Sequence, residues 1–252
     1  TFAQLYDLPG TPAAQARLPA VHSRELVSVL KKFAQVPRRL GNFSADYFTT
    51  EMWHETGAQR DGTIRRLTCF VDSPAQFVLS GPHFFVSNPL YKTPRAICNT
   101  PRAYDLLDLS SIPDSYLPRC NYVPACDAET YVARMPTVQW IEDGADRPRP
   151  VTAYSRVVAR RMLSQSGERT LVPCLVPPGV AHINLAFSVV PRKPRDAVLL
   201  CALFSSVPMD FFIKSTGKGD FRSDLAQQMP VSDEKTSELL ARALALNCLT
   251  EH

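Results

Sequence analysis

The sequence contains no C-x-x-C pair and no H-E-x-x-H motif, although it has seven cysteines and five histidines. An odd set of scattered cysteines argues against a disulfide framework and against a structural zinc site. No window reaches the roughly 18 to 20 uninterrupted apolar residues that a membrane span requires. The first residues also lack a basic segment followed by an apolar one, so no secretory signal is expected. These absences predict a cytoplasmic protein with no membrane partner and no metal.

Glycine is also scarce, and its placement excludes one kind of cofactor site. The ten glycines are dispersed, and the nearest approach to G-x-G is "GKGD" at 217–220, after a predicted helix rather than before one. No loop is therefore expected to hold S-adenosylmethionine, although Asn88-Pro89-Leu90-Tyr91 is similar to the N-P-P-Y motif of amino-methylating enzymes. Leu90 replaces the second proline, which favours a simple turn. "DEK" at 233–235 matches part of a nuclease motif, but a helix start also favours acids there. We expect no catalytic residue in this chain.

Proline, in contrast, is abundant, with 22 residues in 252. Because proline interrupts helices and central strands, we expect many short elements and long connections. Apolar periodicity predicts helices over 23–35, 196–217 (restarting at Pro208) and 232–249. Alternation predicts a hairpin over 57–71 and strands over 137–143, 150–160, 169–177 and 182–191. The expected fold is therefore α+β, with helices packed on a mixed or antiparallel sheet of short strands.

Charge is unevenly distributed along the chain. Residues 147–222 carry 12 basic and 4 acidic side chains, a net +8, whereas 1–146 carry −1 and 223–252 carry −3. A local excess of this size attracts polyanions. Of the 28 basic residues, 21 are arginine, whose planar fork suits phosphate and guanine edges. A G+C-rich genome would explain the ratio of arginine to lysine, but not the clustering.

The candidate binding residues fall in three groups. In the first, Arg119, Asn121 and Tyr122 follow Pro118, in residue types that read guanine, read adenine and stack on bases. A purely structural turn is the alternative. In the second, Arg156 and Arg160 share one face of an extended segment, and Arg161 and Arg169 point to the other. A solvated charged face is the alternative there. The third group is Lys214, Lys218 and Arg222, at a helix end where cations also favour the dipole.

These segments together resemble a known family. "YSRVVARRMLSQSGERTLVPCLVPPG" (154–179), "VLLCALFSSVPMDFFIKSTGKGDF" (198–221) and "LAQQMPV" (225–231) resemble the target-recognition region of large single-chain adenine-N6 DNA methyltransferases. These enzymes belong to type IIG and IIL restriction–modification systems and to BREX and DISARM phage defence. The matching positions are Arg160, Glu168, Arg169, Thr170, Leu203, Ser205, Ser206, Asp210, Phe211, Lys214 and Met229-Pro230-Val231. "MWHETGAQRDGTIRR" (52–66) and "DSYLPRCNYVP" (114–124) look like the preceding segment in the defence-associated branch.

The resemblance implies a double-stranded DNA partner, with the basic groups facing the duplex and Glu168 orienting Arg169. It implies a connector and helix at 1–40, a target-recognition domain at 41–231 and a C-terminal helix at 232–252. The catalytic domain, with its S-adenosylmethionine, is expected outside this chain as a second partner in the same polypeptide. Lys214 departs from the family's arginine, which exchanges a fork for a point charge. Two alternatives stay open: a protein-interaction module of a defence complex, and a small methyltransferase using Asn88-Pro89-Leu90-Tyr91.

Overall fold

The computed structural model describes residues 5, 12–15, 21, 23–43, 45–100, 102–232 and 237–252. This part of the chain contains seven α-helices: α2 (Arg24–Gln35), α3 (Glu55–Arg60), α4 (Ala128–Ala133), α5 (Pro194–Phe204), α6 (Val207–Ser215), α7 (Ser223–Gln228) and α8 (Ser237–Asn247). Its strands are β1 (Tyr47–Thr50), β2 (Ile64–Cys69), β3 (Val78–Leu79), β4 (Lys92–Pro94), β5 (Tyr104–Leu106), β6 (Cys120–Pro124), β7 (Arg156–Arg160), β8 (Pro173–Val176), β9 (Ala181–His182) and β10 (Ala186–Pro191). The expected α+β fold is confirmed.

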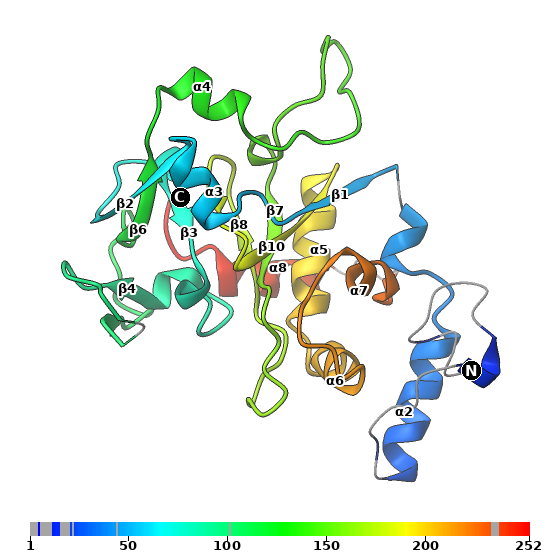
Figure 1. The fold of residues 1–252 in the computed structure, drawn as a ribbon. Coiled ribbons are helices and arrows are strands. Elements are labelled where there is room, and N and C mark those ends of the chain that lie inside the picture. The colour runs from blue at the N-terminus through cyan, green and yellow to red at the C-terminus, as the bar shows by residue number, and fades with distance from the viewer. Residues whose placement is uncertain are drawn as a thin grey trace.

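The centre of the fold is an antiparallel four-stranded sheet in the order β1-β10-β7-β8 (Figure 1). One face of this sheet is covered by α5, with α6, α7 and α2 completing the layer. Val157, Ala159 and Phe187 from the strands pack there among side chains such as Phe204 and Phe212 from the helices. These residues are fully or almost fully buried, so this layer forms the main hydrophobic core.

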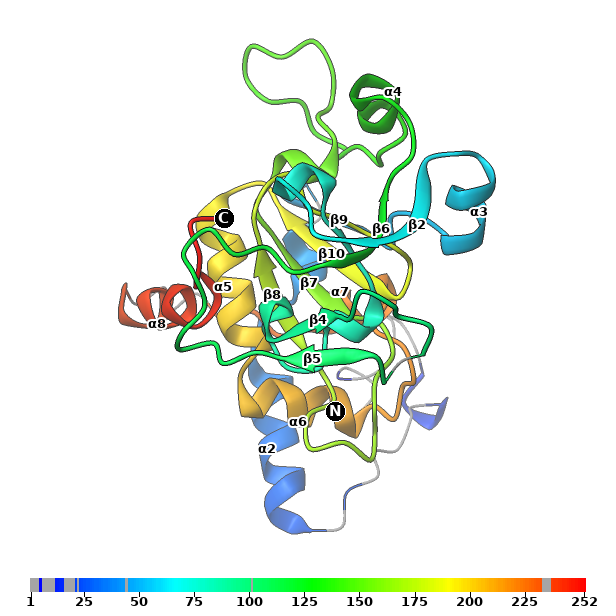
Figure 2. The ribbon, with the colours of Figure 1, turned by 90° about the vertical axis from the view of Figure 1, so that its left-hand side faces the viewer.

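The opposite face of the sheet is covered by three small two-stranded sheets instead of helices. The pairs β2-β6 and β4-β5 are antiparallel, and β3-β9 is parallel, which makes the fold mixed (Figure 2). Val158, Cys174 and Ala186 of the central sheet meet Leu79 and Cys120 in this second core. The molecule therefore has a helical side and a ribbon side, separated by β7 and its neighbours.

Two predicted elements differ from the structure. The first arm of the hairpin expected over 57–71 is helix α3, which the His54 side chain caps by accepting from the Gly57 N–H at 3.4 Å. Gly62, at φ +74°, then turns the chain into β2, which pairs with the distant β6. The strand expected over 137–143 is also wrong, because apart from a single bridge between Thr137 and Pro150 that segment is irregular.

The helical segment after β10 follows the sequence closely. It breaks between α5 and α6, where Pro208 occupies the first turn of α6, and Gly217 at φ +66° follows its end. Among the described residues, no single helix is long and apolar enough to cross a membrane; α5 and α6 pass that test only as a pair bent by 70°.

The N-terminal part of the described chain packs on the helical side, whereas the last residues, after α8, extend to the ribbon side (Figure 1). Leu30 of α2 and Leu40 are buried in the main core, and the Leu40 N–H donates to the Met229 carbonyl at 2.9 Å. Helix α8 packs against α5. The predicted divisions at residues 40 and 231 therefore fall within packed regions of the structure, and the three-part organisation stays a prediction.

Candidate nucleic-acid interface

Arg156, the first arginine of β7, lies inside the protein. Its side chain is 0% exposed, and its guanidinium donates to Ser188 Oγ at 3.3 Å and to the carbonyls of Tyr154 and Val180. Burial lowers the pKa of Arg156 to about 10. The prediction that Arg156 contacts DNA is wrong, because its N–H groups donate to acceptors inside the protein and its side chain is not accessible from the surface. Sequence alternation had placed it correctly on the Arg160 face, but that face is covered by the ribbons.

Asn121 and Tyr122 on β6 are also structural. The Asn121 amide accepts a hydrogen bond from the Thr68 hydroxyl at 3.0 Å and is 2.7 Å from the Tyr104 hydroxyl, to which it donates. The Tyr122 hydroxyl donates to Glu55, and desolvation raises the pKa of this phenol. Both side chains are buried. The predicted roles of Asn121 in reading adenine and of Tyr122 in stacking are therefore wrong, because β6 is the inner strand of its ribbon.

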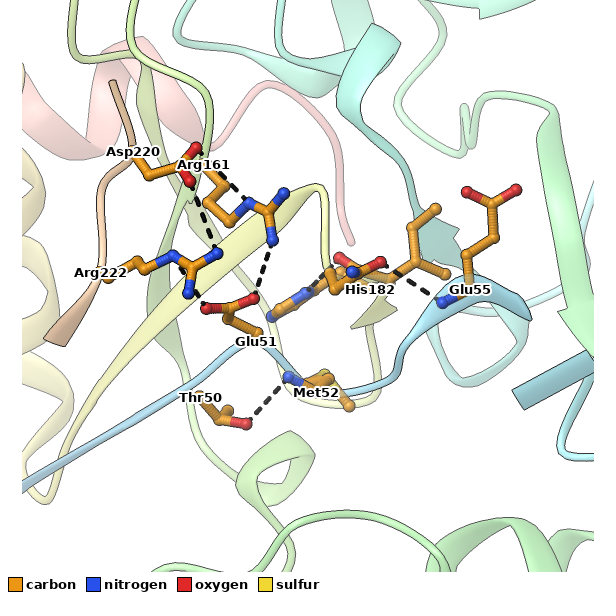
Figure 3. A network of polar contacts seen from close by, with 10 residues as sticks. Thr50, Glu51, Met52, Glu55, Arg161, His182, Asp220 and Arg222 are labelled. Atoms are coloured by element: carbon orange, nitrogen blue, oxygen red, sulfur yellow. Dashed lines mark hydrogen bonds and ion pairs between the residues drawn. The ribbon is translucent and has the colours of Figure 1, made fainter. Parts of the chain in front are cut away.

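Arg161 points to the helical side, where it is held by carboxylates. Figure 3 shows Arg161 and Arg222 converging on Glu51, which follows β1, and on Asp220, which precedes α7. The closest contact joins Arg161 Nη1 and Glu51 Oε2 at 3.0 Å. Two cations and two anions balance each other here, and the network ties β1, β7 and the α6–α7 connection together. A DNA contact by Arg161 or Arg222 stays a prediction, but neither guanidinium is free.

The residues that carried the family resemblance fasten the β7–β8 loop onto α6. Asp210 Oδ1 accepts the backbone N–H groups of Thr170 and Leu171 at 2.8 and 2.7 Å. Arg169 donates to the Ser205 carbonyl at 2.7 Å and pairs with Asp210 at 3.6 Å. Asp210, and not Glu168 as expected, is therefore the carboxylate that orients Arg169. The two segments that resemble the family, "GERT" (167–170) and "SSVPMDFFIK" (205–214), are therefore joined by one group of contacts around Asp210, which we call the clamp.

Two lysines complete this clamp. Lys214 Nζ donates to the Gly167 carbonyl at 2.8 Å, and Lys218 pairs with Asp224. The Lys218 carbonyl accepts from the Gln165 side chain at 2.7 Å. DNA contacts by Arg169, Lys214 and Lys218 stay predictions, and each of these groups already has a protein partner. The loop that they hold begins directly after Arg161.

Arg160 differs from all of these, because its side chain forms neither a hydrogen bond nor an ion pair within the described residues, although its backbone N–H donates to the Val172 carbonyl at 3.1 Å. It ends β7 on the ribbon side, partly exposed, close enough to Lys92 of β4 for the two charges to repel each other. Desolvation, and secondly the charge of Arg160, lower the pKa of Lys92. Two neighbouring cations without a carboxylate form an arrangement that favours an anionic ligand.

A third cation is attached to the same strand. The backbone N–H of Arg119 donates to Thr93 Oγ1 at 3.0 Å, and its guanidinium donates to the Pro94 carbonyl at 3.4 Å. Arg119 therefore lies beside β4, and it forms no ion pair with a described residue. We call Phe70, Phe85, Lys92, Arg119 and Arg160 the β4 surface.

The two aromatic residues of the β4 surface are open to solvent and carry its cations. Phe85 is 56% exposed with Lys92 Nζ 3.8 Å from its ring centre, and Phe70 is 55% exposed with the Arg119 guanidinium at 4.4 Å. Phe85 also stacks on Tyr91 at 6.1 Å. Exposed aromatic faces beside unpaired cations are the combination that nucleic acids bind.

Of the β4 surface, the sequence had singled out Arg119 and Arg160 as candidates, and their DNA contacts stay predictions. Lys92, Phe85 and Phe70 were not among the candidates. The sequence did contain a signal for Phe85 and Lys92, because aromatic and basic residues lie close together in "FFVSNPLYK" (84–92). That segment was instead interpreted through its similarity to N-P-P-Y. In the structure Asn88 caps a short 3-10 helix, Pro89–Tyr91, by accepting from the Leu90 N–H at 3.0 Å. Its amide also donates to the Leu246 carbonyl at 3.2 Å. Because Asn88 is buried and both its polar atoms are engaged, the small-methyltransferase alternative has no accessible asparagine.

Two further features bear on cofactors and partners. Among the residues that the structure describes, no group of three or more His, Cys, Asp or Glu side chains is arranged to hold a metal ion. An apolar cleft of about 370 Å³ lies beside β8 and α5, between Leu90, Leu175, Val176 and Leu244. Its lining is mainly apolar, but Arg195, Asn247 and His252 also border it.

No protein-family model matches the chain, and no curated protein matches it.

Proposed function

We propose that this chain recognises double-stranded DNA as the target-recognition part of an adenine-N6 DNA methyltransferase. Its catalytic domain, which would hold S-adenosylmethionine and receive the flipped adenine, lies in another part of the same polypeptide. The observation that carries the proposal is the β4 surface, where Lys92, Arg119 and Arg160 lack carboxylate partners among the described residues.

The physical argument starts from desolvation and charge. A cation that already has a carboxylate gains little from a phosphate, because it must exchange one anion for another. A cation without such a partner gains the full attraction and releases counterions from the duplex. Arg160 and Lys92 are of the second kind, and their mutual repulsion is relieved when a phosphate lies between them.

The clamp around Asp210 supports the same proposal in a different way. It fixes the loop that follows Arg160 and Arg161 through the residues shared with the family. A fixed loop holds the end of β7 in one geometry, and contacts to a duplex need cations held in register with the phosphates. In this proposal the shared residues position the interface, and the β4 surface touches the DNA.

The test is a salt titration of duplex binding, read by fluorescence anisotropy with a labelled duplex of random sequence. Each phosphate contact contributes about −0.9 to the slope of log affinity against log salt. The double variant Lys92→Ala/Arg160→Ala should therefore reduce the slope by about 1.8 and weaken binding at low salt.

The matched control is Lys31→Ala/Lys32→Ala, which removes two exposed lysines from α2, on the helical side of the molecule (Figure 1). This control should keep most of the slope. A wild-type chain without salt-dependent duplex affinity, or equal slopes for the two double variants, would contradict the proposal.

The apolar cleft favours a second function, a protein-interaction module of a defence complex. Leu244 of α8, 40% exposed, borders the cleft beside Leu175 and Val176 of β8. Under this alternative, Leu244→Arg abolishes binding of a purified partner protein but leaves duplex binding unchanged. Competition between that partner and duplex DNA for the β4 surface would instead join the two functions in one site.

A further inference from the structure

The β4–β5 hairpin carries an apolar side chain at its tip that nothing in the described chain covers. Ile97 lies in the connection between Pro94 and Tyr104 and is 76% exposed. A single exposed apolar side chain is common on a protein surface, so exposure alone gives Ile97 no role. What bears on its role is how the tip is held and which charges lie beside it.

The tip is held in place and is not a loose loop. Cys98, next to Ile97, is buried, and its carbonyl accepts from Arg66 Nη2 of β2 at 3.0 Å. Asn121 of β6 donates to the Cys98 sulfur at 3.7 Å. Within the hairpin, the Arg95 N–H donates to the Ala103 carbonyl at 3.0 Å. Ile97 is therefore presented outward by a fixed scaffold.

This anchoring also gives Asn121 a role that the sequence analysis did not anticipate. Its amide joins Thr68 of β2, Tyr104 of β5 and Cys98 of the tip in one buried group. Asn121, which was expected to read a base, instead fixes the position of the β4–β5 hairpin relative to β2 and β6. It acts as a positioning residue.

The surroundings of the tip are cationic. Arg102, in the same connection, is exposed and has no partner among the described residues, and Arg95 is exposed with Asp105 at 2.8 Å. Lys92 of the β4 surface stands at the root of the same hairpin. At about 3.3 Å per residue in extended chain, the tip and Lys92 are at most about 17 Å apart, which corresponds to roughly five base-pair steps. A duplex is long enough to span this separation.

We infer that Ile97 is a wedge that enters a base step of the bound duplex, with Arg102 and Lys92 contacting phosphates on either side. Apolar side chains inserted in this way unstack a step and kink or unwind the helix. The cost of unstacking, a few kcal/mol per step, is offset by the added contacts of the deformed duplex. The inference rests on the proposed DNA recognition and extends it to deformation of the DNA.

The charge of this neighbourhood favours DNA over a protein as the occupant. An apolar protein partner would have to bury Arg102, Lys92 and Arg160 without counter-charges, which is costly. A duplex supplies phosphates to each cation and an apolar base stack to Ile97. The same geometry thus satisfies both kinds of group.

The experiment uses the chain and a closed circular plasmid, which offers many sequences at once. Protein and plasmid are incubated with a topoisomerase, the protein is removed, and the linking number is read on a gel. The wild-type chain should change the linking number in proportion to bound protein. Ile97→Ala should lose at least half of this change while its duplex affinity, from anisotropy, falls less than threefold. Ile97→Met, which keeps an apolar wedge, should restore the change.

The matched control is Ile141→Ala, the same substitution at a side chain that is 50% exposed in the connection between α4 and β7. That connection lies well apart from the β4–β5 hairpin in both ribbon views (Figures 1 and 2). Ile141→Ala should behave as wild type in both measurements. Because both residues are exposed, neither substitution is expected to affect folding.

The possible failures are distinguishable. Absence of any wild-type duplex binding would overturn the proposed function itself. Binding without a change in linking number, or an unchanged effect in Ile97→Ala, would overturn the wedge and leave DNA recognition standing. Loss of binding to a purified protein partner in Ile97→Ala, with plasmid topology unaltered, would assign the tip to protein contact and also overturn the wedge.

Discussion

Arg160 and Arg161 are neighbours in sequence but lie on opposite sides of the central sheet. On the helical side, Arg161 shares Glu51 and Asp220 with Arg222 and helps to hold β1 and β7 together. On the ribbon side, Arg160 meets Lys92 and has no carboxylate. Identical side chains therefore perform different tasks, because strand alternation sends one toward acids and the other toward an exposed, cationic surface.

Arg156 adds a third case on the same strand. It has the Arg160 orientation, but the ribbons cover it completely, and it donates to backbone carbonyls and to Ser188. The comparison teaches that an arginine cluster in sequence is a mixture of structural and surface groups. Whether an arginine is structural or remains at the surface depends on how deeply it is buried and on whether a carboxylate lies nearby.

The largest effect on stability is expected at Arg156. Arg156→Ala leaves a cavity and strands the Val180 and Tyr154 carbonyls without this donor, and it should cost about 3 kcal/mol of unfolding free energy. Urea unfolding followed by circular dichroism measures this loss. Arg156→Met, which keeps the volume, should lose less. An alanine variant within about 0.5 kcal/mol of wild type would show that Arg156 is not the structural member of the three.

A pH dependence should accompany the buried cluster. His182 is 2.7 Å from Ser188 Oγ, and burial, followed by the charge of Arg156, lowers the pKa of His182 to about 3. Since the unfolded value is about 6.5, the unfolded chain binds more protons between these values. The contribution of His182 is therefore fully present above about pH 6.5 and falls by roughly 1.4 kcal/mol per pH unit below it.

Urea titrations between about pH 7 and pH 5 check this slope. His83 is also fully buried with a lowered pKa, so it adds a slope of the same sign. His182→Gln should reduce the total slope without abolishing it. An unchanged slope in that variant would mean that His182 becomes protonated without unfolding.

The smallest effects sharpen the original contrast. Arg161→Ala should cost about 1 kcal/mol of stability, because it removes partly buried ion pairs, whereas Arg160→Ala should stay within about 0.5 kcal/mol. Duplex affinity should show the reverse order, with a loss of about fivefold for Arg160→Ala and less than about twofold for Arg161→Ala. The two measurements, unfolding and anisotropy on the same variants, separate the sides of β7. Equal losses of affinity would remove the distinction.

Some elements were predictable from local signals alone. Ser23 was expected to begin a helix, and its side chain does accept from the Leu26 N–H at 3.2 Å at the start of α2. The break at Pro208 was likewise predictable, because it depends only on the proline ring. Hairpin pairing over 57–71 was not, since the true partner of β2 is β6 and long-range pairing leaves no mark within a short window.

The candidate interface was less predictable than the fold. Arg160 was identified from its sequence cluster, but nothing in the sequence distinguishes it from Arg156, four residues earlier on the same face. Asn121 looked suited to reading a base, yet its amide is enclosed by Thr68, Tyr104 and Cys98. Lys92 lies far from the basic segment in sequence and reaches Arg160 only through the packing of β4 on the ribbon side.

The sequence by itself determined the mixed α+β character, the helix boundaries set by caps and prolines, and the excess of positive charge in 147–222, because these depend on local geometry and composition. Tertiary structure alone decided which cations are free. Whether a guanidinium finds a carbonyl, a carboxylate or solvent depends on the residues that distant segments bring within a few ångströms, and that information is distributed over the whole chain.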